Sequence, residues 1–335
     1  MGDRPDHTRT APIFPGRLDF SSRFGDILKL KRDVGDRETL TTILVFGNSG
    51  QVGRELMRSV QNTDKIIGVS RPQVDLLDAD SIARAFDESS PTVAINAAAY
   101  TAVDKAETER ATAFAVNRDG PANLARACAA RGIPLIHLST DYVFDGSKAG
   151  PYVEADAVSP ISVYGSSKEA GEQALRELLE RHVIVRTAWV YSPFGTNFVK
   201  SMLRLGAERD ELSVVNDQRG CPTSARSIAL ALLTLAKQLA RSPDQGLGTF
   251  HFVGGGATNW YDFAIAIFRT AAARGLRTPR IKAITTAQYP TPAKRPFNSI
   301  LDCHRIGEVY GIKQSSWHSE LDKCLDELLS DAKGT

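Results

Sequence analysis

Short apolar runs alternate with amphipathic stretches along the chain after Thr41. The run "ILVF", Ile43–Phe46, is too short for a helix and apolar at successive positions, which is typical of a parallel strand buried on both faces. Four similar runs follow, at Lys65–Val69, Thr92–Asn96, Leu135–Ser139 and Val183–Arg186. Helical periodicity lies between them, at Gly53–Val60, Ser81–Ser89, Ala111–Arg131 and Ser162–Arg181. This alternation predicts an α/β fold, a Rossmann-type doubly wound parallel sheet with ligands at the carboxyl ends of its strands.

The regular alternation of short strands and helices ends near Phe194. Helices are predicted at Asn197–Arg209, Ser224–Arg241, Asn259–Arg274 and Ser316–Leu329, separated by short strands and by glycine- or proline-rich loops such as "VGGGATNW" and "YPTPAKRPFNS". We therefore expect residues 41–193 to form mainly the Rossmann domain. Residues 194–330 would form mainly a smaller, irregular α/β substrate lobe, with segments of the two able to interweave.

Residues 1–40 mix charges of both signs with glycine and proline and show no sustained period. They lack the apolar core of a secretory signal, and their aspartates argue against an organelle transit peptide. We predict a disordered or loosely attached extension. Two alternatives stay open, namely a partner-binding arm and a start codon assigned too far upstream.

Composition narrows the classes of partner. The chain is 42% hydrophobic and 24% charged, and 41 basic against 39 acidic side chains give a net charge of +2. This balance predicts neither nucleic-acid nor membrane binding, and no apolar run approaches the roughly 20 residues of a membrane helix. The four cysteines are scattered without C-x-x-C pairing, which argues against a zinc site and a disulfide framework. We expect the protein to be located in a reducing cytoplasm.

Three glycines follow the first strand, at Gly47, Gly50 and Gly53. The first permits a tight turn, the second a close approach of a ligand to the backbone, and the third the packing of the next helix on the strand. Unpaired N–H groups at a helix start suit a pyrophosphate. The spacing G-x-x-G-x-x-G predicts a dinucleotide cradle, although an ordinary tight turn would use the same residues.

Tyr164 and Lys168 lie four residues apart near the start of a predicted helix, so both side chains share one face. A phenol has an ordinary pKa near ~10, and an adjacent ammonium stabilises its ionised form. Tyr164 could then donate a proton to a carbonyl oxygen, with Lys168 lowering its pKa and holding a cofactor ribose. Thr140 ends a buried strand and would hydrogen-bond the same oxygen. The alternatives are a surface Tyr–Lys pair and a strand-terminal turn residue.

Two more strand ends complete the predicted crevice. Small residues after the third strand, Ala97, Ala98 and Ala99, leave room for a flat cofactor, although close helix packing would favour alanine equally. Ser70 and Arg71 follow the second strand, where an arginine favours the 2′-phosphate of NADPH over the free hydroxyl of NADH. We predict NADPH, with NADH and a merely solvated arginine as the alternatives.

Taken in order, the glycine loop, the alanine segment, the Ser-Thr pair and Y-x-x-x-K resemble the extended short-chain dehydrogenase/reductase superfamily. More narrowly, the chain resembles the dTDP-4-dehydrorhamnose reductase family over roughly residues 43–330. The segments that carry this resemblance are "NAAAYTAVDKAE", "STDYVFDG", "VYGSSKEAGE", "RTAWVYSPFGTNFVKSML", "NDQRGCPTSA" and "PTPAKRPFNS".

This resemblance implies a function and a set of site residues. The reaction would be NAD(P)H-dependent reduction of the C4 keto group of dTDP-4-dehydro-L-rhamnose, in dTDP-rhamnose synthesis for cell-surface polysaccharides, by a cytoplasmic monomer or homodimer. The implied catalytic residues are Thr140, Tyr164 and Lys168. The implied cofactor contacts are Gly50, Gln51, Val52, Asp75, Leu76, Ala99, Tyr100 and Thr101, and the implied substrate contacts are Val103, Thr140, Asp141 and Trp189.

Two positions need separate treatment. Arg295, in a proline-stiffened loop, is a candidate for gripping the sugar diphosphate, and pairing with a carboxylate across the lobes is the alternative. Some members of the resembled family bind Mg²⁺ through acidic side chains at a dimer interface. The segment after "CPTSA", where one acidic residue is expected, has Arg226 instead. No metal ligand is therefore assigned, and Mg²⁺ stays undecided.

The same fold carries several other functions. Dehydratases typically have a glutamate after the Thr-Asp pair, and this chain has Tyr142 there. Another nucleotide-sugar reductase or epimerase remains an alternative, because fold alone does not set function. A non-catalytic regulatory subunit, like the methionine adenosyltransferase beta subunit, is a second alternative, against which the complete triad and Trp189 argue.

Overall fold

The computed structural model describes residues 1–2, 41–59 and 64–331. The expectations for the extension up to residue 40, and the predicted end of the first helix at Val60, lie outside the described residues. All helices and strands named below belong to the compact unit Leu40–Thr335. Within the described residues, no helix is long and apolar enough to cross a bilayer.

Six parallel strands form the central sheet, in the order β10-β5-β4-β3-β1-β2. Their bounds are β1 (Thr41–Phe46), β2 (Asp64–Val69), β3 (Val93–Asn96), β4 (Leu135–Thr140), β5 (His182–Thr187) and β10 (Gly248–His251). The five predicted strands and the doubly wound α/β architecture are confirmed. Because β2 and β3 lie on opposite sides of β1, the strand order reverses there and opens a crevice at the carboxyl ends.

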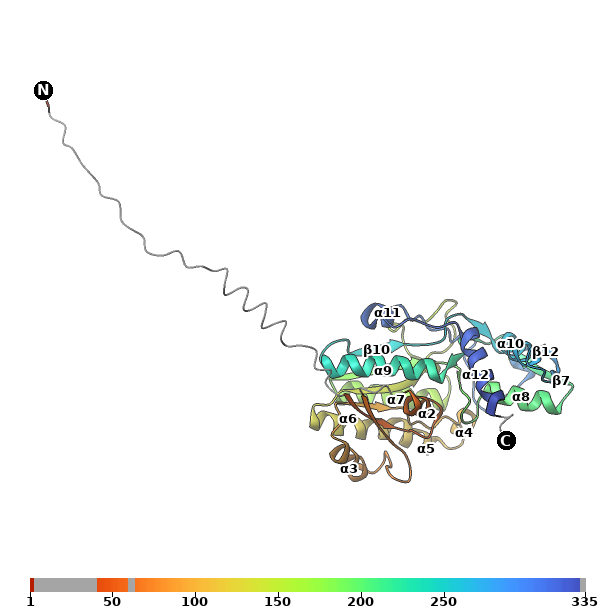
Figure 1. Ribbon diagram of the computed structural model, residues 1–335, viewed down its shortest axis with the longest axis horizontal. Coiled ribbons are helices and arrows are strands. Elements are labelled where there is room, and N and C mark those ends of the chain that lie inside the picture. Colours follow the sequence, from red (N-terminus) through yellow and green to blue (C-terminus); the bar gives the residue numbers. More distant parts are fainter. Residues whose placement is uncertain (3–40, 60–63, 332–335) are drawn as a thin grey trace. The chain divides into compact units, whose positions relative to one another are not determined.

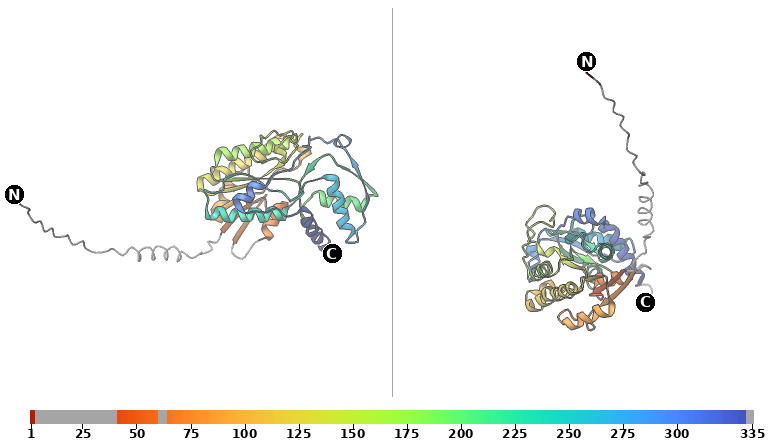
Figure 2. Two further views of the ribbon diagram at one scale, coloured as in Figure 1. Left: turned by 90° about the horizontal axis from the view of Figure 1, so that it is seen from above. Right: turned by 90° about the vertical axis from the view of Figure 1, so that its left-hand side faces the viewer.

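Successive residues of β1 enter two separate cores. Ile43 and Val45 pack with α2 and α9, whereas Leu44 and Phe46 face α3, α6 and α7, so both faces of the sheet are covered (Figures 1 and 2). This double burial explains why the strand is apolar at consecutive positions. The bounds are α2 (Gln51–Arg58), α9 (Ala225–Arg241), α3 (Ala79–Ser89), α6 (Gly120–Arg131) and α7 (Val163–Leu178).

The predicted helix Ala111–Arg131 is interrupted. It consists of α5 (Arg110–Phe114), a π-helical segment η1 (Ala115–Asp119) and α6. In η1 the buried Asn117 accepts from the backbone N–H of Tyr100 at 2.8 Å and donates to Tyr100 O at 3.0 Å and Ser167 Oγ at 2.9 Å. These contacts with distant segments favour the wider turn, and π turns of this kind are frequent at functional sites.

The remaining helices and strands lie outside the six-stranded sheet. A separate core joins α8 (Phe198–Glu208), β7 (Glu211–Val215), α10 (Trp260–Ala272) and α12 (Trp317–Asp331), and β12 (Arg280–Ile284) pairs with β7 in parallel. Shorter elements connect these parts. They are α4 (Val103–Ala106), η2 (Asp141–Val143), β6 (Val190–Tyr191), β8 (Arg219–Gly220), β9 (Thr223–Ser224), β11 (Thr258–Asn259), η3 (Thr286–Gln288) and α11 (His304–Tyr310). Although α9 and β10 follow residue 194, α9 packs on the main sheet and β10 is one of its strands.

Close packing between α7 and η1 predicts the effect of one substitution. A Cβ on Gly171 would lie 2.0 Å from Asn117 O, so Gly171→Ala must separate the two helices. We expect the free energy of unfolding to fall by about 1–3 kcal/mol in urea titrations. The matched control is Gly150→Ala, since a Cβ at Gly150 meets no atom within 4 Å. Equal stability of the two variants would contradict this packing.

Candidate active site

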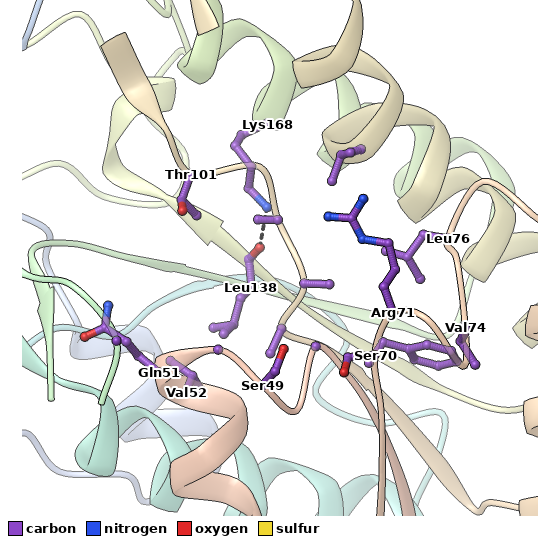
Figure 3. Close-up of a pocket in the computed structure, with 18 of the residues that line it drawn as sticks. Ser49, Gln51, Val52, Ser70, Arg71, Val74, Leu76, Thr101, Leu138 and Lys168 are labelled. Atoms are coloured by element: carbon purple, nitrogen blue, oxygen red, sulfur yellow. Dashed lines mark hydrogen bonds between the residues drawn. The ribbon is translucent and has the colours of Figure 1, made fainter. Parts of the chain in front are cut away.

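A cavity of about 1050 Å³ lies at the carboxyl ends of the main strands. Lys168 and Arg71 extend toward its middle from different sides, and the loop with Ser49 and Gln51 forms its floor (Figure 3). Most of the predicted cofactor residues line it, namely Gly47, Gly50, Gln51, Val52, Ser70, Arg71, Asp75, Leu76, Ala97, Ala98, Ala99, Thr101, Tyr164 and Lys168. Gly53 and Tyr100 do not.

The glycine loop has no room for side chains at two positions. Gly47 has a φ of +88°, and a Cβ there would lie 2.6 Å from Ala98 N. A Cβ on Gly53 would lie 2.1 Å from Gly47 O, so Gly53 shapes the cradle without lining it. Gly50 is the N-cap of α2 and provides no capping side chain. The first turn of α2 therefore presents bare backbone at the cavity, which fits a dinucleotide pyrophosphate.

Tyr164 and Lys168 share the cavity-facing side of α7, as the spacing predicted. Ser162 caps this helix by accepting from Gly165 N at 3.1 Å. Lys168 Nζ donates to Leu138 O at 2.6 Å and lies 3.2 Å from His137 Nε2. Burial lowers the pKa of Lys168 to about 8, although Glu172 acts in the opposite direction. Tyr164 and Lys168 are both buried.

The pKa of Tyr164 is raised to about 12, mainly because burial disfavours the phenolate, while a hydrogen bond with Thr140 acts in the opposite direction. The pKa of Tyr164 is thus raised, whereas the sequence predicted that Lys168 would lower it. A phenol with this pKa is protonated at neutral pH. It can donate a proton to a substrate.

Thr140 and Asp141 adjoin Tyr164 outside the cavity lining. The Thr140 hydroxyl donates to Asp141 Oδ1 at 2.9 Å and accepts from Tyr142 N at 3.2 Å. Burial raises the pKa of Asp141 to about 6, against hydrogen bonds from Ser299 and Thr140. Asp141 therefore changes charge closer to neutral pH than an ordinary carboxyl group.

The other predicted substrate residues lie on separate segments. Val103 on α4 packs in one apolar cluster with Tyr164. Trp189 has a φ of +48°, and its ring stacks on Trp260 with centroids 3.5 Å apart. Arg295 Nη2 pairs with Asp104 Oδ2 at 2.9 Å, and this ion pair lowers the pKa of Asp104. The structure therefore contains the alternative interpretation of Arg295, in which its guanidinium pairs with a carboxylate.

Sequence reasoning missed several residues that build the site. The cavity is also lined by residues of α5 and η1 and by a loop after β6, including Ala111, Thr112, Ala115, Val116, Gly195 and Thr196. The small residues Ala111 and Ala115, four apart, were the available signal for a helix face against a ligand. Tyr100, predicted to touch the cofactor, donates its hydroxyl to Glu109 Oε2 at 2.7 Å.

A buried ion pair supports the end of β4. Glu172 on α7 accepts from Arg186 Nη2 on β5 at 2.7 Å and from Ser139 Oγ at 2.5 Å. Both charged side chains are almost fully buried. Burial opposes the charged carboxylate, but Arg186 and Ser139 outweigh it and lower the pKa of Glu172. Because Ser139 lines the cavity, this pair fixes part of its wall.

No group of three or more His, Cys, Asp or Glu side chains suited to a metal ion occurs among residues 1–2, 41–59 and 64–331. Arg226 lies in the first turn of α9, beside a small cavity that also contacts Glu55 and Glu320. The geometry gives no reason to assign Mg²⁺.

Comparison with known proteins decides the family. The model of the RmlD substrate binding domain matches residues 41–330. The dTDP-4-dehydrorhamnose reductase of Sinorhizobium fredii is 44% identical over 292 residues, which cover 87% of this chain and 99% of that protein. The chain belongs to the dTDP-4-dehydrorhamnose reductase family.

Solved structures agree with this membership. A dTDP-4-dehydrorhamnose reductase from Clostridium acetobutylicum has 38% sequence identity and a TM-score of 0.80, over 86% of this chain and all of that one. The family member from Bacillus anthracis, solved in complex with NADP, has 34% identity and a TM-score of 0.80, over 86% of this chain and 99% of that one.

The buried ion pair generates a pH-dependent prediction. Arg186→Met leaves Glu172 buried without its main partner, and we expect a loss of about 3–5 kcal/mol in the free energy of unfolding at pH 7. In the wild type the pKa of Glu172 is lowered, so its contribution is full above the unfolded pKa and disappears as pH falls through the folded one. Because the carboxylate of Glu172 titrates below its ordinary pKa of 4.5, urea titrations from pH 7 to about pH 3 should show the stability difference between the wild type and Arg186→Met shrinking.

The control is Arg204→Met on α8, where both partners of the ion pair with Glu208 are more than half exposed. Exposed pairs contribute about 0–1 kcal/mol. The role of the buried ion pair would be contradicted if Arg186→Met lost no more free energy of unfolding than the control. A loss that grows toward pH 4 would contradict it as well.

Proposed function

We propose that this protein reduces the C4 keto group of dTDP-4-dehydro-L-rhamnose to dTDP-L-rhamnose with NADPH. The observation that carries the proposal is that Tyr164 and Lys168 line the same cavity as Gly47 and Gly50. Such an arrangement places a proton donor beside a dinucleotide cradle. Membership of the dTDP-4-dehydrorhamnose reductase family supports the choice of this substrate.

In this mechanism the side chains orient the ketone and supply its proton. A bound nicotinamide would supply the hydride. Tyr164 transfers its phenolic proton to the carbonyl oxygen, and Thr140 polarises that oxygen by hydrogen bonding. The raised pKa of Tyr164 keeps the donor protonated at neutral pH. Lys168, fastened to Leu138 O, holds the position of α7 and would contact the cofactor ribose.

Arg71 supports NADPH as the cofactor. It follows β2 and extends into the cavity (Figure 3), and within the described part of the chain its guanidinium has no ion-pair partner. A 2′-phosphate would give it one, by a charge-assisted hydrogen bond.

Arg295, which forms an ion pair with Asp104, supports a charged substrate. Their ion pair ties α4 to the 286–300 loop, and Arg295 also donates to Thr291 Oγ1 at 2.5 Å. A sugar diphosphate would compete with the Asp104 carboxylate for this guanidinium. Trp189, held by its stack on Trp260, would present an apolar face to the sugar ring.

Tyr142 favours reduction over dehydration. Its ring contacts that of Tyr164 edge to face, with centroids 5.5 Å apart. Burial raises the pKa of Tyr142, so this phenol is a poor replacement for the acid that a dehydratase needs. We also propose that the protein acts in the cytoplasm, as a monomer or homodimer.

Tyr164→Phe tests the proton donor. We expect kcat for reduction of dTDP-4-dehydro-L-rhamnose to fall by about 10²–10⁴-fold, because the phenolic proton is lost. Cofactor binding, measured by fluorescence titration with NADPH, should change little. The control Tyr289→Phe removes the same hydroxyl from an exposed tyrosine. Near-normal turnover of Tyr164→Phe would reject the assignment.

Arg71→Ala tests the cofactor preference. Loss of a charged hydrogen-bond donor should weaken NADPH binding by about 1.5–3 kcal/mol, roughly 10- to 150-fold, and leave NADH binding nearly unchanged. Calorimetric titration of both cofactors measures this. Arg84→Ala, on the exposed side of α3, is the control. If Arg71→Ala lost equal affinity for NADPH and NADH, Arg71 would not recognise the 2′-phosphate.

A further inference from the structure

The 192–197 loop, which joins β6 to α8, forms part of the cavity wall. Gly195 of this loop lines the cavity, as does Gln51 in the first turn of α2. A Cβ on Gly195 would lie 3.3 Å from Gln51 Cγ, so the backbone of the loop packs against the stem of the Gln51 side chain. The carboxamide at the end of this side chain is therefore the part that can meet a ligand.

Hydrogen bonds from the loop fix the orientation of the Gln51 amide. Asn197 is the N-cap of α8, and its Oδ1 accepts from Lys200 N at 3.1 Å. Its NH₂ group lies on the other side, where Nδ2 donates to Gln51 Oε1 at 2.9 Å and to Ser192 O at 2.8 Å. The Ser192 hydroxyl lies 3.1 Å from the same Gln51 oxygen and can donate to it. Because an amide NH₂ can only donate, the atom of Gln51 beside Asn197 must be its oxygen.

The nitrogen of the Gln51 amide is left for a ligand. Among the residues that the structure describes, Gln51 Nε2 has no hydrogen-bond partner. Gln51 and Arg71 lie on opposite sides of the cavity (Figure 3), because Arg71 follows the edge strand β2 and Gln51 reaches the loop that follows β5 and β6. Tyr164, beside the end of β4, is on the Gln51 side. With a 2′-phosphate at Arg71, the nicotinamide half of the cofactor therefore lies near Gln51.

We propose that Asn197 and Ser192 are positioning residues for the cofactor: their donors hold Gln51 Oε1 at the loop and aim its NH₂ group at an oxygen of the nicotinamide half of NADPH, in its phosphate or its ribose. This donor adds to the bare backbone N–H groups at the start of α2. An amide turned the other way would present an acceptor to an acceptor. The inference rests on the proposed function only in the choice of NADPH as the cofactor.

The two partners belong to different parts of the fold. Gln51 begins α2 on the main sheet, whereas Asn197 caps α8, which packs in the separate outer core. Phe194 fastens the loop to α2 as well, because the guanidinium carbons of Arg54 and Arg58 lie 5.5 and 5.0 Å from the centre of its ring. Since both ends are held, the Gln51 amide cannot turn without losing its bonds to the loop.

The first test reverses the bond between Asn197 and Gln51. In Asn197→Asp one carboxylate oxygen can still cap α8, but the other accepts where the NH₂ group donated. We expect the Gln51 amide to turn and present its oxygen to the cavity. Calorimetric titration of the full-length protein should then show NADPH binding weakened by about 10-fold or more, as for the loss of a hydrogen bond to a charged group. Binding of adenosine 2′,5′-bisphosphate, which lacks the nicotinamide half, should stay at its wild-type value.

A double-mutant cycle separates positioning from the added charge. The side chain of Gln51→Met has a similar length and no amide, so Asn197→Asp has nothing to turn in that background. We expect the effect of Asn197→Asp on NADPH affinity to disappear there. If Asn197→Asp weakened NADPH binding by the same factor in the wild type and in Gln51→Met, the charge or a displaced loop would be responsible, and the proposal would be wrong.

The matched control is Asn216→Asp, which adds the same charge at an exposed position outside the cavity lining. It should leave the affinity for NADPH at its wild-type value. Urea titration establishes that Asn197→Asp is folded. A folded Asn197→Asp with wild-type affinity for NADPH would overturn the proposal, and so would an equal loss of affinity for adenosine 2′,5′-bisphosphate.

A second measurement uses the wild type alone. The side-chain amide signal of Gln51 in ¹H–¹⁵N spectra, assigned by its absence in Gln51→Met, should shift when NADPH is added and stay in place when adenosine 2′,5′-bisphosphate is added. A signal that NADPH leaves unchanged would reject the contact. None of these experiments uses the sugar substrate. A protein that binds NADPH through Gln51 and does not reduce dTDP-4-dehydro-L-rhamnose would contradict the proposed function alone, so the two failures can be distinguished.

Discussion

The hydrogen bond from Lys168 Nζ to Leu138 O joins the helix that carries Tyr164 to the end of β4. A buried lysine is costly unless its nitrogen has partners, so this contact and His137 largely determine where α7 can lie. The position of α7 in turn sets the distance between the phenol and the glycine loop. The chemistry of the cavity therefore depends on a bond that does not itself take part in the reaction.

Close backbone approaches hold the other walls in place. Gly47 and Gly53 let β1, α2 and the alanine segment meet without side chains, and Gly171 does the same for α7 and the π segment. The buried ion pair of Glu172 and Arg186 then fixes β4 against β5. These packed helices and strands hold the cavity walls in fixed positions, which favours the binding of a dinucleotide.

Local patterns predicted the parts of this structure that local forces determine. The five strands, the glycine loop and the shared face of Tyr164 and Lys168 follow from apolar runs, steric freedom at glycine and helical spacing. The π segment was not predicted, because it depends on bonds from Asn117 to Tyr100 and Ser167. The return of β10 to the main sheet, the pairing of Asp104 with Arg295 and the hydrogen bond from Asn197 to Gln51 depend on contacts between distant residues. No periodicity in the sequence encodes them.

The most direct test of the account is the fate of the hydride. The protein would be incubated with dTDP-4-dehydro-L-rhamnose and NADPH carrying deuterium at C4 of the nicotinamide, one diastereomer at a time, and the product examined by NMR and mass spectrometry. The account predicts dTDP-L-rhamnose with one deuterium at C4 of the sugar, from only one of the two diastereomers. A product without deuterium at that carbon, or no conversion by the intact protein, would contradict it.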